Sequence, residues 1–389
     1  MKRLRDLFKF RSKSKEHPYK KKSNKISSVQ RDPKTSDHER IMSVYHLIVL
    51  DESGSMSCVR GQTISGCNET LQTIEQMQRT NPDTQRHYVS IYAFDTDNSR
   101  YIINDQPIDD VPLLTDQDYS PYGGTPLYDA LGKTLGEFDA TLNKGSGIGY
   151  VTTITDGEEN SSREYSLTQI QQLIQMLKEK GVVFSFIGAN IDAEAYARSM
   201  HIDNAMQFTQ DEQGTREMWE RERMSKMRSN ARMEFERRYE REAFEHFAEN
   251  ENIGQYYSSV ATDRITPAHI TSLQPGEIFV FGSNIRGQHN AGAAGFALKR
   301  FGAVIGQNEG LQGRSYAIPT TGIGEEELYR AIVRFTTFAQ SHPELTFLVT
   351  PIGCGNAGWQ PYSIAPMFQR AARLPNVKLP QVFWTYCYD

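Results

Sequence analysis

The sequence predicts an α/β protein with two domains, each built around a mostly parallel sheet covered by helices. Apolar segments with the length of buried strands alternate with segments of helical spacing, first over residues 44–189 and again over residues 276–373. Polar or glycine-rich segments directly follow several of these strands. The length of 389 residues exceeds what one core usually organises. Strands that alternate with helices form parallel sheets with helices on both faces.

Four strands and three helices are expected in the first domain. Residues 44–50 form a nearly continuous apolar run, as in a strand that is buried on both faces. Apolar side chains recur at helical spacing in residues 126–142, and Gly181 ends the helix that begins at Leu167. The predicted strands are 44–50, 87–94, 150–155 and 182–189, and the predicted helices are 65–79, 126–142 and 167–180.

A charged segment precedes the second domain. Residues 217–250 are rich in Glu, Arg and Met and lack Pro and Gly, so a helix with a partial apolar stripe is expected there. Further strands are predicted at 276–284, at 315–320, from Leu345 onward and at 381–389, with helices at 291–301, 325–341 and 363–373. The predicted organisation is a basic arm (1–40), a first α/β domain (41–215), a charged helical linker (216–261) and a second α/β domain (262–389).

The formal net charge of −5 combines a basic arm with an acidic remainder. Residues 1–40 contain 14 Lys and Arg against 5 Asp and Glu, a net charge of +9, so the remaining residues carry −14. This composition fits a disordered tail that aids solubility. The Leu and Phe residues among the cations also fit a short helix on anionic lipid, and contact with nucleic acid is a third interpretation.

The sequence contains neither a membrane-spanning pattern nor a secretory signal. It has no run of eighteen apolar residues, and the arm has no apolar segment with a cleavage site. The cysteines form no CxxC pair, so free thiols are expected at Cys58, Cys67, Cys354 and Cys387. These observations favour a cytoplasmic location.

Three polar clusters of the first domain are candidates for a metal site. One begins at Asp51, directly after a strand, one is the segment 123–126 that enters a helix, and one contains Asp156, directly after another strand. Each cluster alone could simply cap a turn or a helix. Loops at the carboxyl edge of one parallel sheet can converge, however, and hydroxyl and carboxylate oxygens suit Mg²⁺, Mn²⁺ or Ca²⁺.

These clusters resemble the metal-ion-dependent adhesion site of the von Willebrand factor A (VWA) family, which is a DxSxS motif followed by Thr and Asp on two later loops. The matching residues are Asp51, Ser53, Ser55, Thr125 and Asp156. The resemblance covers residues 41–215 and implies a doubly wound, Rossmann-like sheet. It also implies that the three hydroxyls lie near a metal ion, that the two carboxylates act partly through water, and that the ion binds a carboxylate of a protein partner.

Two glycine-rich loops follow strands of the second domain. Small residues let backbone N–H groups approach a phosphate, and the N-terminus of a following helix favours an anion. Tight turns or close helix–sheet packing would explain the glycines of either loop alone. The two loops together favour a phosphate ligand. The candidate binding residues are Gly282, Ser283, Asn284, Gly292, Gly295, Gly353, Cys354, Gly355, Ala357 and Gly358.

The same loops resemble those of the macrodomain family, which binds ADP-ribose and related nucleotides. The resemblance covers residues 262–389 and implies a three-layer α/β/α domain. Asn284 matches an Asn at a strand end of that family, and residues 352–358 fit its second phosphate loop. The glycine triplet of the family is AGAAG here, and its adenine-binding acid has no clear counterpart, so binding is favoured over hydrolysis. Asn284 and His289 are the catalytic candidates if the domain is an enzyme.

Three functions are therefore compatible with the sequence. The first is a cytoplasmic adaptor and sensor, which binds a protein carboxylate through a Mg²⁺-dependent site and an ADP-ribose-type nucleotide through its second domain. The second is an ADP-ribosyl hydrolase or another enzyme that processes ADP-ribose derivatives. The third is a protein-assembly module whose second domain is degenerate.

Overall fold

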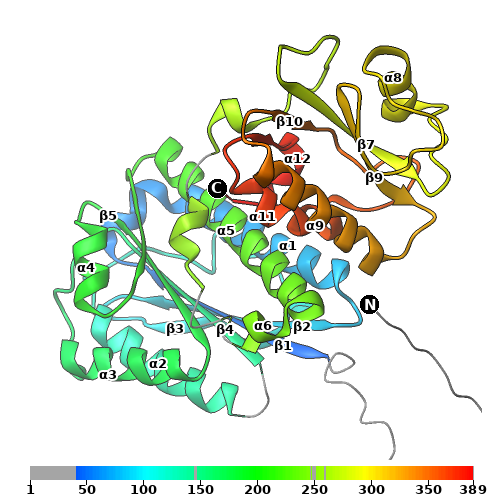
Figure 1. The fold of residues 1–389 in the computed structure, drawn as a ribbon. Coiled ribbons are helices and arrows are strands. Elements are labelled where there is room, and N and C mark those ends of the chain that lie inside the picture. Colours follow the sequence, from blue (N-terminus) through cyan, green and yellow to red (C-terminus); the bar gives the residue numbers. More distant parts are fainter. Residues whose placement is uncertain (1–40, 144–146, 246, 248–250, 258–259, 389) are drawn as a thin grey trace, which may run out of the picture. The chain divides into compact units, whose positions relative to one another are not determined.

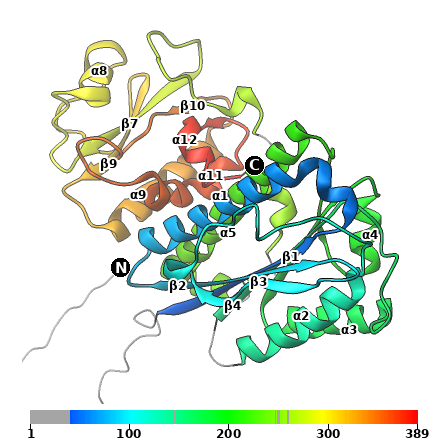
Figure 2. The ribbon, with the colours of Figure 1, turned by 180° about the vertical axis from the view of Figure 1, so that it is seen from behind.

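Two mostly parallel sheets organise the part of the chain that the computed structural model describes, which is residues 41–143, 147–245, 247, 251–257 and 260–388 (Figures 1 and 2). The strand orders are β3-β2-β1-β4-β5-β6 and β11-β10-β7-β9-β8. In these two sheets, β3 and β8 run antiparallel to their neighbours and the other pairs are parallel. The predicted basic arm lies outside the described residues.

The first sheet is wound in two directions from its central strand β1. The chain adds β2 and β3 on one side of β1 and then returns to add β4, β5 and β6 on the other side. The strands are β1 (Met42–Asp51), β2 (Gln85–Phe94), β3 (Arg100–Pro107), β4 (Gly147–Thr155), β5 (Val182–Ala189) and β6 (Asn204–Phe208). The loops after β1 and β4 therefore leave a topological switch point, where ligands bind in sheets of this kind.

Helices cover both faces of this sheet. Leu47 and Val49 of β1 pack with α2, α3 and α4, whereas Ile48 and Leu50 pack with α1 and α5 on the opposite face (Figure 1). This follows from the alternation of side chains along a strand. The helices are α1 (Arg60–Thr80), α2 (Leu127–Leu142), α3 (Leu167–Glu179), α4 (Ala193–Ser199) and α5 (Glu212–Tyr239).

The second sheet is also the middle layer of three. Phe279 and Phe281 of β7 pack with α8, while Ile278 and Val280 pack with α9 and with the C-terminal helices. The strands are β7 (Glu277–Asn284), β8 (Gly310–Gln312), β9 (Ser315–Thr321), β10 (Thr346–Val349) and β11 (Val377–Lys378), and the first two helices are α8 (Gly292–Arg300) and α9 (Glu325–Ser341).

The structure differs from the predicted elements mainly near the C-terminus. The strand predicted at 381–389 is wrong, because the chain forms α12 (Gln381–Trp384) there. Phe383 and Trp384, adjacent in the sequence, enter the same core, whereas adjacent side chains of a strand point to opposite faces. The helix predicted at 363–373 is divided into α10 (Pro361–Ile364), a 3-10 segment and α11 (Gln369–Ala372), because Pro366 has no N–H to donate. Strands β3, β6, β8 and β11 and helix α4 were not predicted.

Helix α5 includes much of the segment predicted to be a charged linker, and it is extensively buried. Thirteen of its residues are buried, six of them charged, so the helix is a packed element in spite of its composition. The ammonium of Lys226 lies 2.6 Å from Glu222 and donates to the hydroxyl of Thr152 in β4 at 3.0 Å. Arg228 donates to the carbonyl oxygens of Tyr256 and Trp384, at 2.6 and 2.9 Å.

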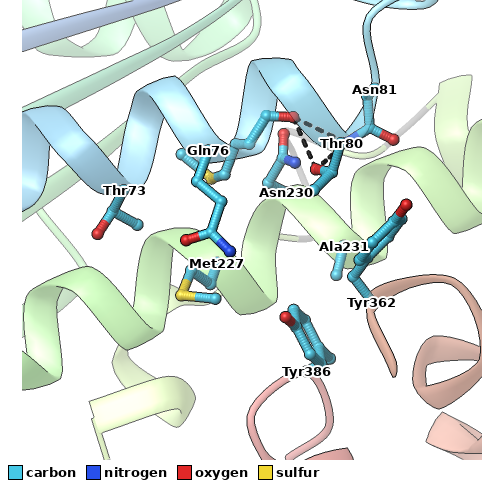
Figure 3. A pocket seen from close by; sticks show the side chains of 10 residues that line it. Thr73, Gln76, Thr80, Asn81, Met227, Asn230, Ala231, Tyr362 and Tyr386 are labelled. Atoms are coloured by element: carbon cyan, nitrogen blue, oxygen red, sulfur yellow. Dashed lines mark hydrogen bonds between the residues drawn. The ribbon is translucent and has the colours of Figure 1, made fainter. Parts of the chain in front are cut away.

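A small cavity lies between α1 and α5 (Figure 3). Its volume is about 40 Å³, and Tyr362 and Tyr386 close it from the C-terminal part of the chain. A cavity of this size holds water molecules, whereas drug-sized ligands need several hundred Å³. We therefore assign it no ligand. Within the described residues, no helix combines the length and the apolar character that crossing a membrane requires.

The face of the sheet beneath α5 contains two buried histidines in adjacent strands. His46 Nε2 lies 3.0 Å from His87 Nδ1, and His87 Nε2 lies 2.9 Å from the side-chain oxygen of Gln85. The side-chain N–H of Gln85 donates to Glu234 of α5 at 3.0 Å. Burial lowers the pKa of His87 to about 3. Burial, then His87 and Lys226, hold the pKa of His46 well below its usual value. Both rings are therefore neutral in the folded protein near neutral pH.

We predict that this pair makes the protein less stable as the pH falls below 6.5. The unfolded chain then binds protons that the folded chain excludes, which lowers the free energy of unfolding by about 1 kcal/mol per histidine between pH 6.5 and 5.5. Urea unfolding at several pH values should show a shallower pH dependence for His87→Gln. The exposed His269 provides the control, since His269→Gln should keep the wild-type slope. Equal slopes in wild type and His87→Gln would contradict the prediction.

Candidate functional site

Asp51 lies at the carboxyl end of β1, with its carboxylate fully buried and hydrogen bonded. The backbone N–H of Ser53 donates to its Oδ1 at 2.7 Å, and the hydroxyl of Thr155 donates to its Oδ2 at 2.6 Å. Tyr119 donates its hydroxyl to the backbone carbonyl of Asp51 at 2.7 Å. Because Thr155 is the last residue of β4, these contacts connect the ends of the two strands on either side of the switch point.

Two serines of the first loop connect Asp51 to Asp156. The hydroxyls of Ser53 and Ser55 lie 3.1 Å apart, and Ser55 donates to Asp156 Oδ1 at 2.8 Å. Asp156 follows β4 directly and is 3% exposed. Four of the five residues predicted to bind a metal thus form one continuous group, although Asp51 and Asp156 are 105 positions apart in the sequence.

Thr125, the fifth residue, lies on the second loop, which packs against the other two. The N–H of Gly54 donates to the carbonyl of Gly123 at 3.1 Å. Asn160 exchanges two hydrogen bonds with the backbone of Thr125, at 3.0 and 3.2 Å. The Thr125 hydroxyl oxygen lies 3.6 Å from the position that a Cβ on Gly157 would take. The hydroxyl of Thr125 therefore lies beside the loop that contains Asp156.

The oxygen atoms of this group suit a hard dication. Burial raises the pKa of Asp51 to about 6, with a smaller contribution from the charge of Asp156, and burial also raises the pKa of Asp156. Two buried carboxylates so close together would be stabilised by a cation. No cluster of three or more His, Cys, Asp or Glu with the arrangement of a metal site occurs in the described residues. The group instead combines two carboxylates with three hydroxyls, which fits Mg²⁺, Mn²⁺ or Ca²⁺ better than zinc.

The acidic neighbours of these aspartates have structural contacts. Glu52 is fully buried, forms an ion pair with Arg100 of β3 and accepts a hydrogen bond from the N–H of Ser120. Glu159 accepts hydrogen bonds from the N–H groups of Ser161 and Tyr128 at 2.8 and 2.9 Å. These two carboxylates hold the loops in place.

Sequence reasoning missed one residue that contacts the group. Gln210, two residues after β6, donates its side-chain N–H to Asp156 Oδ2 and to the carbonyl of Ser55, the latter at 2.9 Å. Its side-chain oxygen accepts from Asn190 at 2.6 Å. A lone glutamine belongs to no metal-binding motif. The only available signal was its position after a sixth strand, and that strand was not predicted.

The two glycine-rich loops of the second sheet meet at one edge. The strands β7 and β10, which precede them, are parallel neighbours. A Cβ on Gly282 would lie 3.5 Å from the backbone N of Gly353, and Trp359 donates its indole N–H to the carbonyl of Thr320, at the end of β9, at 2.8 Å. Loops from three adjacent strands therefore pack together.

The glycines of these loops have two different roles. A Cβ on Gly295 would approach the backbone of Asn290 to 3.2 Å, so close helix packing requires a small residue there. Gly292, Gly355 and Gly358 would place a Cβ in open space. Gly292, Gly353 and Gly358 have φ of +57°, +75° and +79°, in the left-handed region that favours glycine. Ser283 is buried and donates to the carbonyl of Asn284, and Cys354 and Ala357 are half-buried.

Of the catalytic candidates, Asn284 is hydrogen bonded within its own loop, whereas His289 contacts residues of β7 and of the segment after α8. Asn284 Oδ1 accepts from the N–H groups of Arg286 and Gln288, at 3.0 and 3.2 Å, and its Nδ2 donates to the carbonyl of Gln288. The ring of His289 is fully buried, lies edge-on to Phe281 and has its Nε2 3.1 Å from the carbonyl of Gln307. The amide of Asn284 thus shapes the loop after β7, while Nδ1 of the buried His289 ring has no hydrogen-bond partner among the described residues. All four cysteines are free thiols.

Comparison with known proteins gives distant similarities in fold. No protein-family model and no curated protein sequence matches the chain. Among solved structures, the SpaC pilus adhesin of Lactobacillus rhamnosus GG is 13% identical, with a TM-score of 0.37, over 48% of this chain and 31% of its own. Proximal thread matrix protein 1 of the mussel byssus, with a zinc-occupied MIDAS motif, is 17% identical, with a TM-score of 0.33, over 46% and 44%.

The SpRpn10 VWA domain is 11% identical, with a TM-score of 0.30, over 47% of this chain and 95% of its own. This chain thus spans less than half the length of the adhesin and of the mussel protein. Similarities at this level do not assign the chain to a family. The topology and the side-chain geometry of the chain itself must therefore support any function.

We predict that Gly123→Ala destabilises the second loop of the site. Gly123 has φ of +70°, and a Cβ there would lie 2.4 Å from the hydroxyl oxygen of Thr96. A left-handed alanine alone costs about 1–2 kcal/mol, and the contact with Thr96 adds to this. Chemical denaturation should therefore show a lower free energy of unfolding. Gly136 is an exposed position of helix α2, where a Cβ would meet no neighbour. Gly136→Ala should therefore raise the free energy of unfolding by about 0.5–1 kcal/mol. Similar effects of the two substitutions would contradict the prediction.

Proposed function

We propose that residues 41–215 form a VWA-type module that uses a divalent cation to bind a carboxylate of a protein partner. One observation carries the proposal: Asp51, Ser53, Ser55 and Asp156 form one hydrogen-bonded group at the switch point of a doubly wound sheet. Thr125 lies on a third loop that packs against them. This is the order and placement of the family motif that the sequence resembles.

Each residue would have a distinct part in this function. Ser53, Ser55 and Thr125 would offer hydroxyl oxygens, while the buried Asp51 and Asp156 would supply negative charge directly or through water. A bound dication would supply a positive centre for a partner's carboxylate. Since Mg²⁺ prefers six oxygen ligands and keeps several waters, a site with few protein charges leaves room for such a ligand.

We predict that Asp51→Asn abolishes Mg²⁺ binding and leaves the fold intact. Asparagine has the same size and can still accept the N–H of Ser53, but the site loses one negative charge. Affinity should fall by about 100-fold or more, because changes to outer-shell groups alone cost about 10–100-fold. Isothermal titration with Mg²⁺ measures the affinity, and circular dichroism checks the fold.

The matched control is Asp83→Asn, which removes an exposed carboxylate from the turn before β2. This variant should bind Mg²⁺ like the wild type. A folded wild-type protein that binds no divalent cation, or an Asp51→Asn variant with unchanged affinity, would refute the proposed metal site.

For the second domain we propose binding of a phosphate-bearing nucleotide of the ADP-ribose type. The supporting observation is the meeting of the loops after β7 and β10, where Gly292, Gly355 and Gly358 face open space that backbone N–H groups can share with an anion. Binding is favoured over hydrolysis, because the side-chain amide of Asn284 is hydrogen bonded within its own loop. With the carboxylate site of the first domain, this gives a cytoplasmic adaptor and sensor.

We predict that Gly355→Glu weakens ADP-ribose binding about tenfold, because the new carboxylate repels a nearby phosphate. Gly355 tolerates a side chain, since its φ is not in the left-handed region and a Cβ there meets no neighbour. Isothermal titration with ADP-ribose measures the effect, and Gly355→Ala is the uncharged control. Absence of binding by the wild type would favour the assembly-module alternative, whereas release of ADP-ribose from a modified protein by the wild type would favour the hydrolase.

A further inference from the structure

Gln210 is the residue of the candidate metal site that no motif predicts. It lies between β6 and α5, yet its side chain contacts residues from three other loops, those after β1, β4 and β5. The side-chain N–H groups donate to the backbone carbonyl of Ser55 at 2.9 Å and to Asp156 Oδ2, and the side-chain oxygen accepts from Asn190 at 2.6 Å. All polar atoms of this amide are therefore used at the carboxyl edge of the sheet.

These contacts decide how the carboxylate of Asp156 is presented. Its Oδ1 accepts the hydroxyl of Ser55 at 2.8 Å, and its Oδ2 accepts the amide of Gln210. Both oxygens are thus oriented by neutral donors. A carboxylate held in this way keeps its charge but is restrained from turning an oxygen directly toward a cation beside Ser53 and Ser55.

The side-chain oxygen of Gln210 is fixed by the amide of Asn190. Asn190 follows β5 directly and has φ of +57°, a left-handed conformation that asparagine tolerates better than most residues. This conformation accompanies the hydrogen bond from its side-chain amide to the glutamine oxygen. With that oxygen fixed, the NH₂ group of Gln210 is directed at Asp156 and Ser55.

We propose that Gln210 is a positioning residue that holds Asp156 in the outer shell of the metal site, which weakens metal binding and strengthens binding of a partner's carboxylate. A carboxylate in direct contact neutralises part of the ion's charge and occupies one of its ligand positions. A carboxylate held outside leaves a more positive ion with one more exchangeable water, which an incoming carboxylate can replace. The inference rests on the proposed metal-dependent function. It identifies Gln210 as the residue that sets the balance between the affinity for the metal and the affinity for the partner's carboxylate.

The test uses the full chain with Mn²⁺ as the probe metal and acetate as the probe carboxylate. Gln210→Ala should bind Mn²⁺ about tenfold more tightly, the reverse of the roughly 10–100-fold loss that removal of an outer-shell partner usually causes. Water-proton relaxation of the Mn²⁺ complex should show one fewer bound water than in the wild type, since Asp156 would replace it. Acetate binding is measured by the further loss of bound water. It should be weaker in this variant than in the wild type.

Two further variants make the test specific. Asn190→Gly removes the hydrogen bond to the side-chain oxygen of Gln210, and glycine suits the left-handed backbone. This variant should therefore bind Mn²⁺ more tightly and acetate more weakly than the wild type, each by a smaller factor than Gln210→Ala. Gln207→Ala replaces an exposed glutamine of β6 and should leave the Mn²⁺ affinity, the number of bound waters and the acetate affinity unchanged.

The outcomes separate this inference from the proposed function. If the wild type binds Mn²⁺ and Asp51→Asn does not, the metal site stands, and an unchanged affinity and water number in Gln210→Ala would then overturn the role of Gln210 alone. Weaker Mn²⁺ binding by Gln210→Ala would also overturn it, because that result would make the glutamine a supporting ligand. A folded wild type that binds no Mn²⁺ would overturn both.

Discussion

The burial of Asp51 and Asp156 at one point of a parallel sheet is the constraint on which the first domain depends. Two carboxylates this close to one another are unfavourable in a protein interior unless hydrogen bonds or a cation compensate. The chain provides part of this compensation with the N–H of Ser53 and the hydroxyls of Thr155 and Ser55. Since these donors come from the loops after β1 and β4, the carboxylates hold together the strands on either side of the switch point.

The polar face beneath α5 has a related role. The buried pair of Lys226 and Glu222 contributes little net stability, because removing two charges from water offsets most of their attraction. This pair instead fixes where the helix lies along the sheet, because both side chains contact Thr152. The hydrogen bond between Glu234 and Gln85 has the same effect. Asp211 caps the start of this helix through the N–H of Gly214 at 2.7 Å. The position of α5 therefore also determines where Gln210, one residue before that cap, can reach.

Much of this architecture could be predicted because its signals are local. The apolar run of β1 and the helical spacing of α9 are strong patterns, and the predicted helix at 325–341 coincides with the observed one. The edge strand β3 and the short strand β6 have mixed polar sequences that carry no such pattern, so they were missed. The C-terminal residues 381–384 include Val, Phe and Trp, which favour strands, yet burial of the adjacent Phe383 and Trp384 in one core favours a helical turn.

The candidate site could be predicted in part, for the same reason. DxSxS, Thr125 and Asp156 form a motif with fixed residue types, whereas Gln210 and Asn190 matter only through their place in three dimensions. Asn284 illustrates the opposite limit, because a residue type that suits catalysis has its side-chain amide hydrogen bonded within its own loop. Residue type alone does not distinguish a reacting side chain from a structural one. The hydrogen-bond partners of each side chain do.

In the proposed functions, the same edge of each sheet would bind a ligand, and the two ligands have opposite charge. In the first sheet, oxygen atoms of Asp, Ser and Thr side chains gather after β1 and β4, so the edge favours a cation. In the second sheet, the loops after β7 and β10 have glycines in the corresponding positions, where a Cβ on Gly292, Gly355 or Gly358 would meet no neighbour, and the ligand proposed there is an anion. The sheet only brings the loops together; the side chains, or their absence, decide which ion the edge attracts. A partner that joins a carboxylate to a phosphate-bearing nucleotide would therefore present suitable charges to both sites.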